Sequence, residues 1–315
     1  MKLLVTGGAG FIGSHIAEQA LGRGWEVAVV DDLSSGRREN VPAGATFFEI
    51  DIRDRDAVFQ AVEKFQPDVL SHQAAQASVA ISVREPVRDA EINVIGTLNL
   101  LDASVANGVS RFVFASTGGA IYGEVPSGQA TEETAPRPLS PYAASKFAVE
   151  NYLRCYESEH GLQSTVLRYA NVYGPRQDPH GEAGVVAIFV KRLLAGESLQ
   201  VNAMSEVGDS GCIRDYVHVN DVVKANLAAA EGTIPHAVIN VGTGLESTTQ
   251  HLAELLQHAM ETSVELKFAP RRPGDTQRSL LSPQRFTELF GAPLTLSAGL
   301  VDTIAWFRHQ HAEIA

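Results

Sequence analysis

The stretch that decides the fold lies near the start of the chain and reads Lys2-Leu3-Leu4-Val5-Thr6-Gly7-Gly8-Ala9-Gly10-Phe11-Ile12-Gly13. An apolar run, typical of a buried strand, leads into a glycine-rich turn, and a helical pattern follows as far as Ala20. A second apolar run, residues 26–30, ends at an acid, Asp31. This order predicts a βαβ unit whose first strand–helix turn is rich in glycine.

Three glycines of this turn each have a physical role. Gly7 permits the tight turn, Gly10 lets the backbone approach a pyrophosphate, and Gly13 packs the helix onto the strand. The helix N-terminus offers N–H groups and the positive end of its dipole, and both bind phosphate. The turn therefore predicts a dinucleotide site, and a glycine turn without any nucleotide is the alternative.

Asp31 indicates which dinucleotide would bind. It follows Gly13 by 18 residues, where an acid binds the ribose hydroxyls of the adenosine and repels a 2′-phosphate. The sequence therefore predicts NAD in preference to NADP. The nearby Arg37 and Arg38 are the residues that could instead accommodate a phosphate.

Strands and helices continue to alternate, and they recur about every 20–30 residues, which predicts a parallel, doubly wound α/β sheet of the Rossmann type. After Pro175 the alternation becomes irregular, which predicts a smaller α/β substrate-binding lobe. We expect an NAD-binding domain of residues 1–170 plus about 215–243, and a lobe of about 171–214 plus 244–315. Two further expectations are one helix over residues 88–107 and one strand over residues 214–219.

Composition excludes several classes of partner. The chain has 315 residues and a formal charge of −12, so bulk electrostatics disfavour nucleic acid. No run approaches the ~18 apolar residues of a membrane span, and no signal-peptide pattern precedes the first strand. Cys155 and Cys212 lack the spacing of a metal site, so we expect no metal and a reducing compartment, the cytoplasm.

The stretch Ser140-Pro141-Tyr142-Ala143-Ala144-Ser145-Lys146 suggests chemistry. Ser140 is a good N-cap and Pro141 suits the first helical position, so Tyr142 and Lys146 would sit one turn apart on one face. An ammonium nearby favours the ionised phenol, which lets a tyrosine act as a general base or acid. On spacing alone, a solvated surface pair is the commoner arrangement.

Five motifs together resemble the extended short-chain dehydrogenase/reductase family: residues 6–13, Asn93-Val94-Ile95-Gly96-Thr97, Tyr122-Gly123, the Tyr142/Lys146 pair, and Arg214-Asp215-Tyr216. Within this family the chain is most similar to the UDP-glucose 4-epimerase branch. The stretches that carry this closer likeness are residues 140–146, residues 171–177 and residues 184–189. The resemblance extends from Met1 to about residue 280.

The resemblance implies NAD as the cofactor, with Tyr142 as the catalytic base and Lys146 as the residue that anchors the nicotinamide ribose. The implied cofactor contacts are Gly7, Gly10, Phe11, Ile12, Asp31, Asp32, Ser35, Gly36, Asp51, Ile52, Gln73, Ala74, Ala75, Asn93, Tyr142, Lys146, Tyr169 and Val172.

The third catalytic group in the family is a hydroxyl near the end of the strand before Tyr122. The sequence there is Ser116-Thr117-Gly118-Gly119, and an ungapped alignment puts Gly118 at the usual hydroxyl position. We assign the role to Thr117, with Ser116 as the second choice. The two glycines also disfavour the related 4,6-dehydratases and decarboxylases, because those enzymes carry acids in this turn.

The implied reaction is 4-epimerisation of a UDP-hexose, UDP-glucose or UDP-galactose, through a transient 4-keto sugar. The implied substrate contacts are Thr117, Asn171, Val185, Arg214, Arg272 and Asp275. The two arginines would bind the diphosphate, because a guanidinium suits phosphate geometry. Taken singly, either arginine could equally be an ordinary surface charge.

Two departures from the family pattern bear on specificity. Asn202 stands where an aromatic residue often lies near the uracil, which puts the base contact in question. Ser279 stands at the position of a bulky gate in the glucose-restricted enzymes. A smaller gate leaves room for an N-acetyl group, so we expect UDP-GlcNAc and UDP-GalNAc to be accepted too.

Other readings stay open from the sequence. One is a 4-epimerase acting on uronic acids or pentoses, and another is a non-catalytic NAD-sensing protein on the same fold. The family also implies a homodimer formed through the helix over residues 88–107 and the helix that carries Tyr142. Apolar positions of these helices could equally belong to the core.

Overall fold

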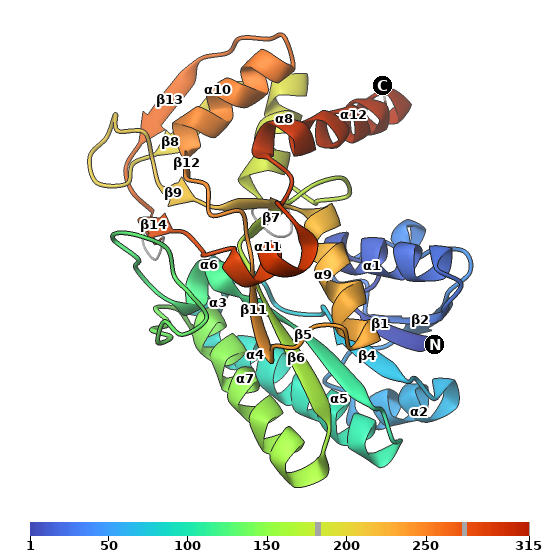
Figure 1. Ribbon diagram of the computed structural model, residues 1–315. Coiled ribbons are helices and arrows are strands. Elements are labelled where there is room, and N and C mark those ends of the chain that lie inside the picture. Colours follow the sequence, from blue (N-terminus) through green and yellow to red (C-terminus); the bar gives the residue numbers. More distant parts are fainter. Residues whose placement is uncertain (180–183, 273–275, 315) are drawn as a thin grey trace. The chain divides into compact units, whose positions relative to one another are not determined.

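The computed structural model describes residues 1–179, 184–272 and 276–314, and the chain forms two compact units (Figure 1). The first unit comprises Met1–Thr117, Pro138–Arg168 and Val222–Ile239, and the second comprises Gly118–Arg137, Tyr169–Asp221 and Asn240–Ala315. These boundaries differ from the sequence-based ones chiefly at residues 118–137, 215–221 and 240–243, which fall in the second unit.

A seven-stranded sheet contains the strands expected from the apolar runs. Its order is β11-β6-β5-β4-β1-β2-β3. The four pairs from β3 to β5 are parallel, which confirms the predicted doubly wound α/β fold. The strands are β1 (Lys2–Thr6), β2 (Glu26–Asp31), β3 (Thr46–Glu49), β4 (Val69–His72), β5 (Arg111–Thr117), β6 (Gln163–Tyr169) and β11 (Val238–Val241).

The order in which the chain adds strands to this sheet reverses between β1 and β4, although the two strands are parallel. From β1 the chain proceeds outward to β2 and β3, whereas β4 and β5 lie on the other side of β1. Ligands of such sheets bind beyond the carboxyl ends of the strands at this reversal. The residues that follow β1 and β4 are therefore the first place to look for a cofactor site.

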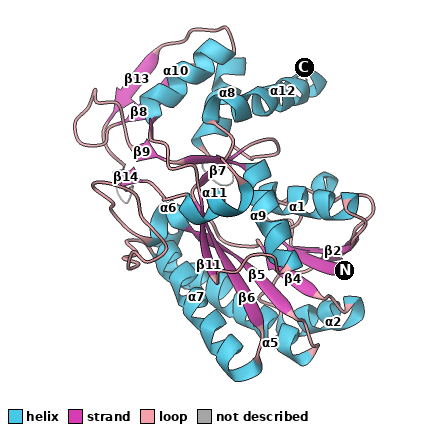
Figure 2. Cartoon of the chain, viewed as in Figure 1, coloured by secondary structure: helices cyan, strands magenta, loops and turns pink. Residues whose placement is uncertain are grey.

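Helices cover both faces of the sheet (Figures 1 and 2). On one face, α2 (Arg55–Phe65), α5 (Gly96–Ala106) and α7 (Pro141–His160) share one hydrophobic core with alternate residues of the strands, among them Leu70, Phe112 and Phe114. On the other face lie α1 (Phe11–Gly22) and α9 (Val219–Glu231). A short 3-10 turn, η1 (Arg38–Asn40), follows β2.

The helix expected over residues 88–107 is instead three consecutive segments. It begins earlier, at α4 (Pro86–Ala90), passes through a π-helical turn, η2 (Glu91–Ile95), and continues as α5. A further short helix, α3 (Val79–Arg84), precedes it. Single π-turns inside α-helices occur frequently at functional sites, and this one has Asn93 at its centre.

Three small sheets belong to the second unit. They pair β7 (Asn171–Tyr173) with β10 (Tyr216–His218), β9 (Ile213–Arg214) with β12 (Ser247–Thr248) and β14 (Arg278–Ser279), and β8 (Leu199–Asn202) with β13 (Leu266–Ala269). The helices are α6 (Gly118–Ile121), α8 (Val185–Leu194), α10 (Thr249–Ala259), α11 (Gln284–Phe290) and α12 (Leu296–Ile314). Residues of α8, α10 and α12 build its hydrophobic core.

The single strand expected over residues 214–219 is wrong, because the chain leaves one sheet and enters another at Asp215. The buried Asp215 carboxylate accepts hydrogen bonds from the backbone N–H of Thr243 at 2.8 Å and of Gly244 at 3.0 Å. These bonds tie the Asp215 side chain to the turn after β11 at the point where the chain passes from β9 to β10, while the Asp215 carbonyl accepts the N–H of Asn171 at 2.9 Å.

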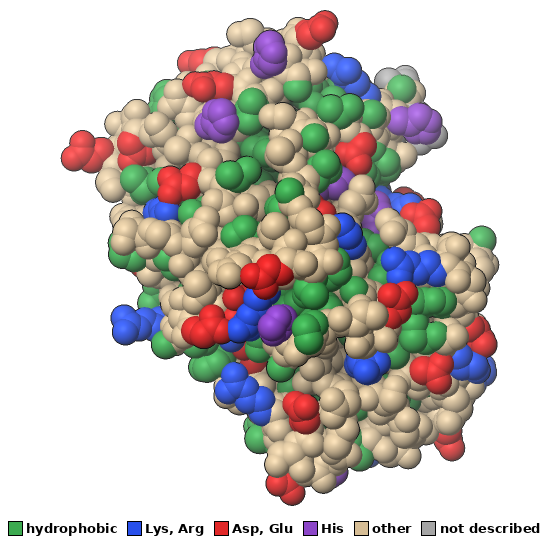
Figure 3. Space-filling view, in the orientation of Figure 1, with side chains coloured by type: hydrophobic (Ala, Val, Ile, Leu, Met, Phe, Trp, Pro, Cys, Tyr) green, Lys and Arg blue, Asp and Glu red, His purple; other side chains and the backbone are tan. Residues whose placement is uncertain are grey.

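The described helices include none that is both long and apolar enough to cross a membrane. On the face of the molecule that Figure 3 shows, acidic and basic side chains are interspersed and form no continuous basic surface. This agrees with the negative formal charge of the chain, −12.

Candidate active site

The glycine turn after β1 has the shape that a dinucleotide phosphate needs. Helix α1 begins at Phe11, and its N-cap, Gly10, has no side chain to occupy the N–H groups of the first turn. Gly7 has a φ of +66°, and a Cβ there would lie 2.6 Å from the backbone nitrogen of Ala74. The loops after β1 and β4 thus touch at the chain reversal, which only glycine permits.

Asp31, at the end of β2, stabilises this turn. One carboxylate oxygen accepts the N–H of Ala9 at 3.0 Å and the other accepts the N–H of Leu33 at 2.9 Å. Burial raises the pKa of Asp31, and these two backbone bonds oppose that change. A carboxylate has about four acceptor positions, so capacity remains for ribose hydroxyls.

Beside Asp31, the expected cofactor residues differ in exposure. Gly36 packs so closely that a Cβ would lie 2.8 Å from an Asp31 oxygen. Asp32 and Ser35 are exposed, and the Asp32 carboxylate accepts the N–H of Ser34 at 3.0 Å. Of the three, Gly36 is the one that lies directly against Asp31, the acid expected to bind the adenosine ribose.

Two expected adenine contacts follow β3. Asp51 binds the guanidinium of Arg53, and those hydrogen bonds lower the pKa of the Asp51 carboxyl. Ile52 is buried beneath Gly96, where a Cβ would lie 2.7 Å from the Ile52 side chain. Asn99 fixes this segment by donating to the carbonyl of Ile52 at 3.0 Å.

The loop after β4 is held in place by side chains of its own unit. Gln73 donates to Ser71 and Asn226, both at 3.0 Å. Asn93, from the π-turn, accepts the N–H of Gln76 at 2.9 Å and donates to the Gln76 carbonyl at 3.0 Å. Asn93 therefore fixes the loop that contains Ala74 and Ala75. Both polar atoms of the Asn93 side chain are used in these hydrogen bonds.

Helix α7 carries Tyr142 and Lys146 as the sequence predicts. The Ser140 hydroxyl caps the helix by accepting the N–H of Ala143 at 3.2 Å, and Pro141 occupies the first turn. Lys146 has only 3% of its surface exposed, whereas Tyr142 is half-buried.

The Lys146 ammonium is bound at the end of β5. It donates to the carbonyl of Ala115 at 2.9 Å and lies 4.8 Å from the centre of the Phe114 ring. Burial lowers its pKa to about 8, and the charge of Asp89 opposes that change. Lys146 therefore keeps an ammonium near neutral pH inside an apolar setting.

Ser116 and Thr117, the two candidate hydroxyls, differ sharply in their partners. Ser116 donates to the buried carboxylate of Glu150 at 2.5 Å, and Arg168 donates to the same carboxylate oxygen at 3.0 Å. Thr117 points to the opposite face of the strand, and within the described part of the chain its hydroxyl makes no hydrogen bond. Ser116 is thus hydrogen-bonded to the buried Glu150–Arg168 ion pair, whereas the Thr117 hydroxyl could bind a ligand.

Apart from Thr117, which ends β5 in the first unit, the expected substrate residues that the structure describes lie in the second unit, together with Tyr169 and Val172. Arg214 donates to the carbonyl of Ile213 at 3.0 Å, and Ser279 is its register partner on β14. Asn171 begins β7 and Val185 begins α8. Asp275 lies outside the described residues.

Arg272 is exposed and lies beside Asn202, the unusual residue near the expected base site. With the Asn202 amide oxygen facing the guanidinium, Arg272 Nε donates to it at 2.8 Å. The Asn202 amide therefore orients one of the two expected phosphate-binding arginines.

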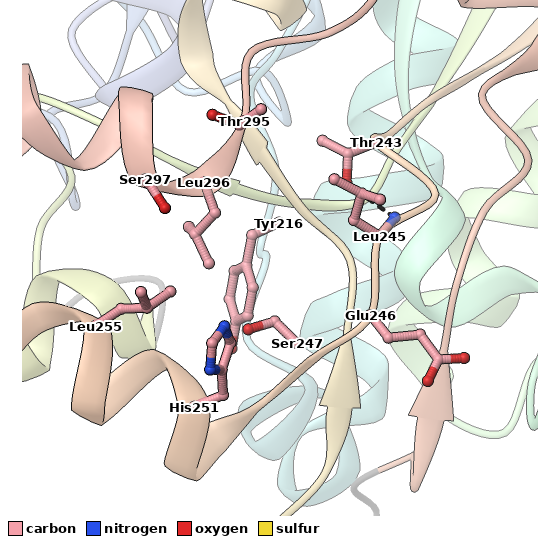
Figure 4. Close-up of a pocket in the computed structure, with 10 residues that line it drawn as sticks. All are labelled: Tyr216, Thr243, Leu245, Glu246, Ser247, His251, Leu255, Thr295, Leu296 and Ser297. Carbon is pink, nitrogen blue, oxygen red and sulfur yellow. Dashed lines mark hydrogen bonds between the residues drawn. The ribbon is translucent and has the colours of Figure 1, made fainter.

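A separate cavity of about 180 Å³ lies within the second unit (Figure 4). It contains none of the expected substrate residues. Its lining residues are Tyr216, Thr243, Leu245, Glu246, Ser247, His251, Leu255, Thr295, Leu296 and Ser297. The described residues also contain no group of three or more His, Cys, Asp or Glu side chains arranged to hold a metal.

The family model described as the NAD dependent epimerase/dehydratase family matches residues 3–242. The chain belongs to this family. Membership confirms the predicted family and its cofactor, NAD, which the glycine turn and Asp31 fit.

Solved structures of similar chains extend this result. The UDP-glucose 4-epimerase of Thermus thermophilus, solved in complex with NAD, is 52% identical with a TM-score of 0.94, over 98% of this chain and 99% of that one. The UDP-glucose 4-epimerase of Thermotoga maritima, solved with UDP-glucose, is 46% identical with a TM-score of 0.93, over 99% and 100%.

A third structure bears on N-acetylated sugars. The UDP-N-acetylglucosamine 4-epimerase of Methanobrevibacter ruminantium M1, in complex with UDP-N-acetylmuramic acid, is 34% identical with a TM-score of 0.89 over 98% of both chains.

Two features of the site were not found from the sequence. Glu150 lies four residues after Lys146 and eight after Tyr142, so helical spacing alone places all three on one face of α7. Asp89 lies four residues before Asn93 and is completely buried. In both cases most of the hydrogen-bond partners of the acid lie in distant segments of the chain, which spacing along the sequence does not show.

We predict that Glu150→Gln destabilises the protein by about 3–5 kcal/mol, because the buried Arg168 guanidinium would face a neutral amide in place of a carboxylate. Chemical denaturation of the purified variant measures this free energy of unfolding. Glu159→Gln, at an exposed position of the same helix, is the matched control and should change stability by less than about 0.5 kcal/mol. Equal stability of the two variants would contradict the prediction.

Proposed function

We propose that this protein is an NAD-dependent UDP-glucose 4-epimerase, which interconverts UDP-glucose and UDP-galactose through a 4-keto sugar. The observation that carries the proposal is the arrangement at the end of β5. There a buried ammonium, Lys146, lies one helical turn from Tyr142, and Thr117 offers a hydroxyl that is not engaged elsewhere in the described chain.

In the proposed mechanism, Tyr142 accepts the proton of the sugar 4-hydroxyl and later returns it. The Lys146 ammonium favours the ionised phenol, which makes Tyr142 a competent base near neutral pH. Thr117 orients the 4-hydroxyl by hydrogen bonding. When bound, NAD supplies the acceptor that takes hydride from C4 and gives it back.

The second unit would bind the part of the substrate that does not react. Arg214 and Arg272 are proposed to bind the diphosphate, with Asn171, Val185 and Asp275 contributing further contacts. Binding energy on this remote group retains the 4-keto sugar while it turns its other face to the cofactor. Epimerisation requires this retention, because release at the keto stage would end the reaction as an oxidation.

The turn after Thr117 distinguishes this reaction from the other one named in the family description. Dehydration needs an acid and a base beside the sugar to remove water. Here Gly118 and Gly119 follow the hydroxyl and offer no side chain for proton transfer. The proposal is therefore reversible hydride chemistry at one carbon.

The experiment that tests the proposal is product analysis by NMR with UDP-glucose, comparing the natural protein with Tyr142→Phe. We expect UDP-galactose from the natural protein and a kcat lowered by about 10²–10⁴-fold in the variant, because the phenol transfers the proton. Tyr152→Phe, at an exposed tyrosine of the same helix, should keep full activity.

The same assay tests the choice of hydroxyl. Thr117→Ala should lower kcat without lowering stability, whereas Ser116→Ala should lower stability, because it removes a bond to the buried Glu150. Net NADH release, a dehydrated product, or turnover of only UDP-glucuronic acid or a UDP-pentose would contradict the proposed reaction.

We also propose that the enzyme accepts UDP-GlcNAc and UDP-GalNAc, since Ser279 is small and pairs in register with Arg214. Ser279→Tyr should lower kcat/KM for the N-acetylated pair at least tenfold more than for UDP-glucose. The ratio of the two substrates corrects for any general loss of folded protein. An unchanged ratio, or no N-acetylated product from the natural protein, would refute the idea.

A homodimer is proposed through α3, α4, η2 and α7, which pack side by side in the first unit. Large apolar side chains are exposed on these helices, among them Val83, Val87, Ile95 and Tyr152. We expect sedimentation to give a dimer, and Val87→Asp to give a monomer. Val301→Asp is the matched control, because Val87 and Val301 are both 70% exposed. A monomeric natural protein would rule the dimer out.

A further inference from the structure

Asp89 of α4 is completely buried and binds three polar side chains. Gln76 Nε2 donates to one carboxylate oxygen at 2.8 Å, and Asn93 Nδ2 donates to the same oxygen at 3.0 Å. Ser145 donates to the other oxygen at 2.7 Å. None of these partners carries a charge, so the network satisfies the hydrogen bonds of Asp89 without neutralising it.

Two amide donors fix one oxygen of Asp89 as an acceptor, because neither amide can be turned round. The Asn93 amide oxygen accepts the N–H of Gln76, and the Gln76 amide oxygen accepts the N–H of Ser78 at 2.7 Å. Both amide nitrogens must therefore face the same Asp89 oxygen as donors, and with the Ser145 hydroxyl on the other oxygen this arrangement favours the carboxylate form.

A cation lies beside one of the residues that bind Asp89. Ser145, which binds Asp89, directly precedes Lys146 on α7, and α4 packs against α7. Burial favours loss of the Lys146 proton, and the charge of Asp89 acts in the opposite direction.

We propose that Asp89 is a positioning residue for catalysis: its buried carboxylate, fixed by Gln76, Asn93 and Ser145, keeps Lys146 charged at the pH where the enzyme works. Asp89 touches neither substrate nor cofactor in this role and acts only through Lys146. The inference rests on the proposed function, because it assigns a purpose to the Lys146 charge.

The other ionisable groups around Lys146 do not supply this charge. His72 of β4 is enclosed between Thr6 and Thr97, and burial together with Lys146 holds its pKa well below the usual value, so it is neutral. Glu150 of α7 is bound to Arg168. Tyr142 itself depends on the Lys146 charge. Asp89 is the remaining carboxylate that acts on Lys146 within the described chain.

Loss of the Asp89 carboxylate should lower the pH at which activity declines. The pKa of Lys146 is about 8 with Asp89 present, so activity that needs the ammonium falls as the pH rises through that value. Removing the carboxylate takes away a stabilising opposite charge, which lowers the pKa of Lys146 further. The alkaline limb of the pH–rate profile should then move to lower pH.

The test compares pH profiles of kcat for the natural enzyme and Asp89→Asn. We expect the alkaline limb of the variant to lie about one pH unit lower or more. Ser145→Ala, which removes a hydrogen bond of Asp89 but keeps its charge, should leave the limb in place. Asp89→Glu, which keeps a carboxylate at this position, should also leave the limb near its natural place.

A second readout does not depend on turnover. NMR of protein labelled at lysine Cε, with the Lys146 signal assigned by its loss in Lys146→Arg, follows the titration of this group directly. Its midpoint should be lower in Asp89→Asn than in the natural protein.

The inference would be overturned if the natural protein and Asp89→Asn had the same alkaline limb of kcat and the same midpoint of the Lys146 titration. That outcome would leave the proposed function intact. If Asp89→Asn does not fold, Asp89→Ser, a smaller neutral residue, takes its place, and a limb and midpoint that coincide with the natural ones would refute the role. A natural protein that converts no UDP-sugar would instead refute the proposed function, and the NMR titration would still decide about Asp89.

Discussion

A buried lysine ammonium is the constraint on which the first unit depends. Lowering the pKa of Lys146 from 10.5 to about 8 corresponds to roughly 3 kcal/mol against the charged form. The carbonyl of Ala115, the face of the Phe114 ring and the charge of Asp89 limit that penalty. The first two belong to β5 and Asp89 belongs to α4, so the position of one charge links the sheet, α4 and α7.

Helix α7 connects this charge to the architecture of the sheet. Tyr142, Lys146 and Glu150 succeed one another at four-residue intervals, and each has a different task. In the proposed mechanism the first takes the proton and the second favours its ionised form, whereas the third binds Arg168 and Ser116 inside the unit. A shift of the helix along its axis would disturb all three tasks together, which explains why its start is defined by a side-chain cap and a proline.

Local rules predicted the parts of the site that depend on neighbouring residues. The glycine turn, the acid after β2 and the cap of α7 all follow from spacing within a few residues. Residue spacing did not predict the features that depend on contacts between distant segments of the chain. The choice between Ser116 and Thr117 depends on Glu150 and Arg168, which lie more than thirty residues away along the chain. Alternating apolar residues likewise suggested one strand over residues 214–219, but the four hydrogen-bond donors around Asp215 divide it.

Each unit is assembled from three separate segments of the chain, and this has a consequence for synthesis on the ribosome. The sheet receives its last strand, β11 (Val238–Val241), only after most of the chain has been made. Until then β6 is an edge strand with unpaired backbone groups, which favours association with other chains. Nascent protein is therefore most exposed to aggregation between the emergence of residue 169 and that of residue 241. Chaperones that bind extended, apolar segments would act on β6 during this interval.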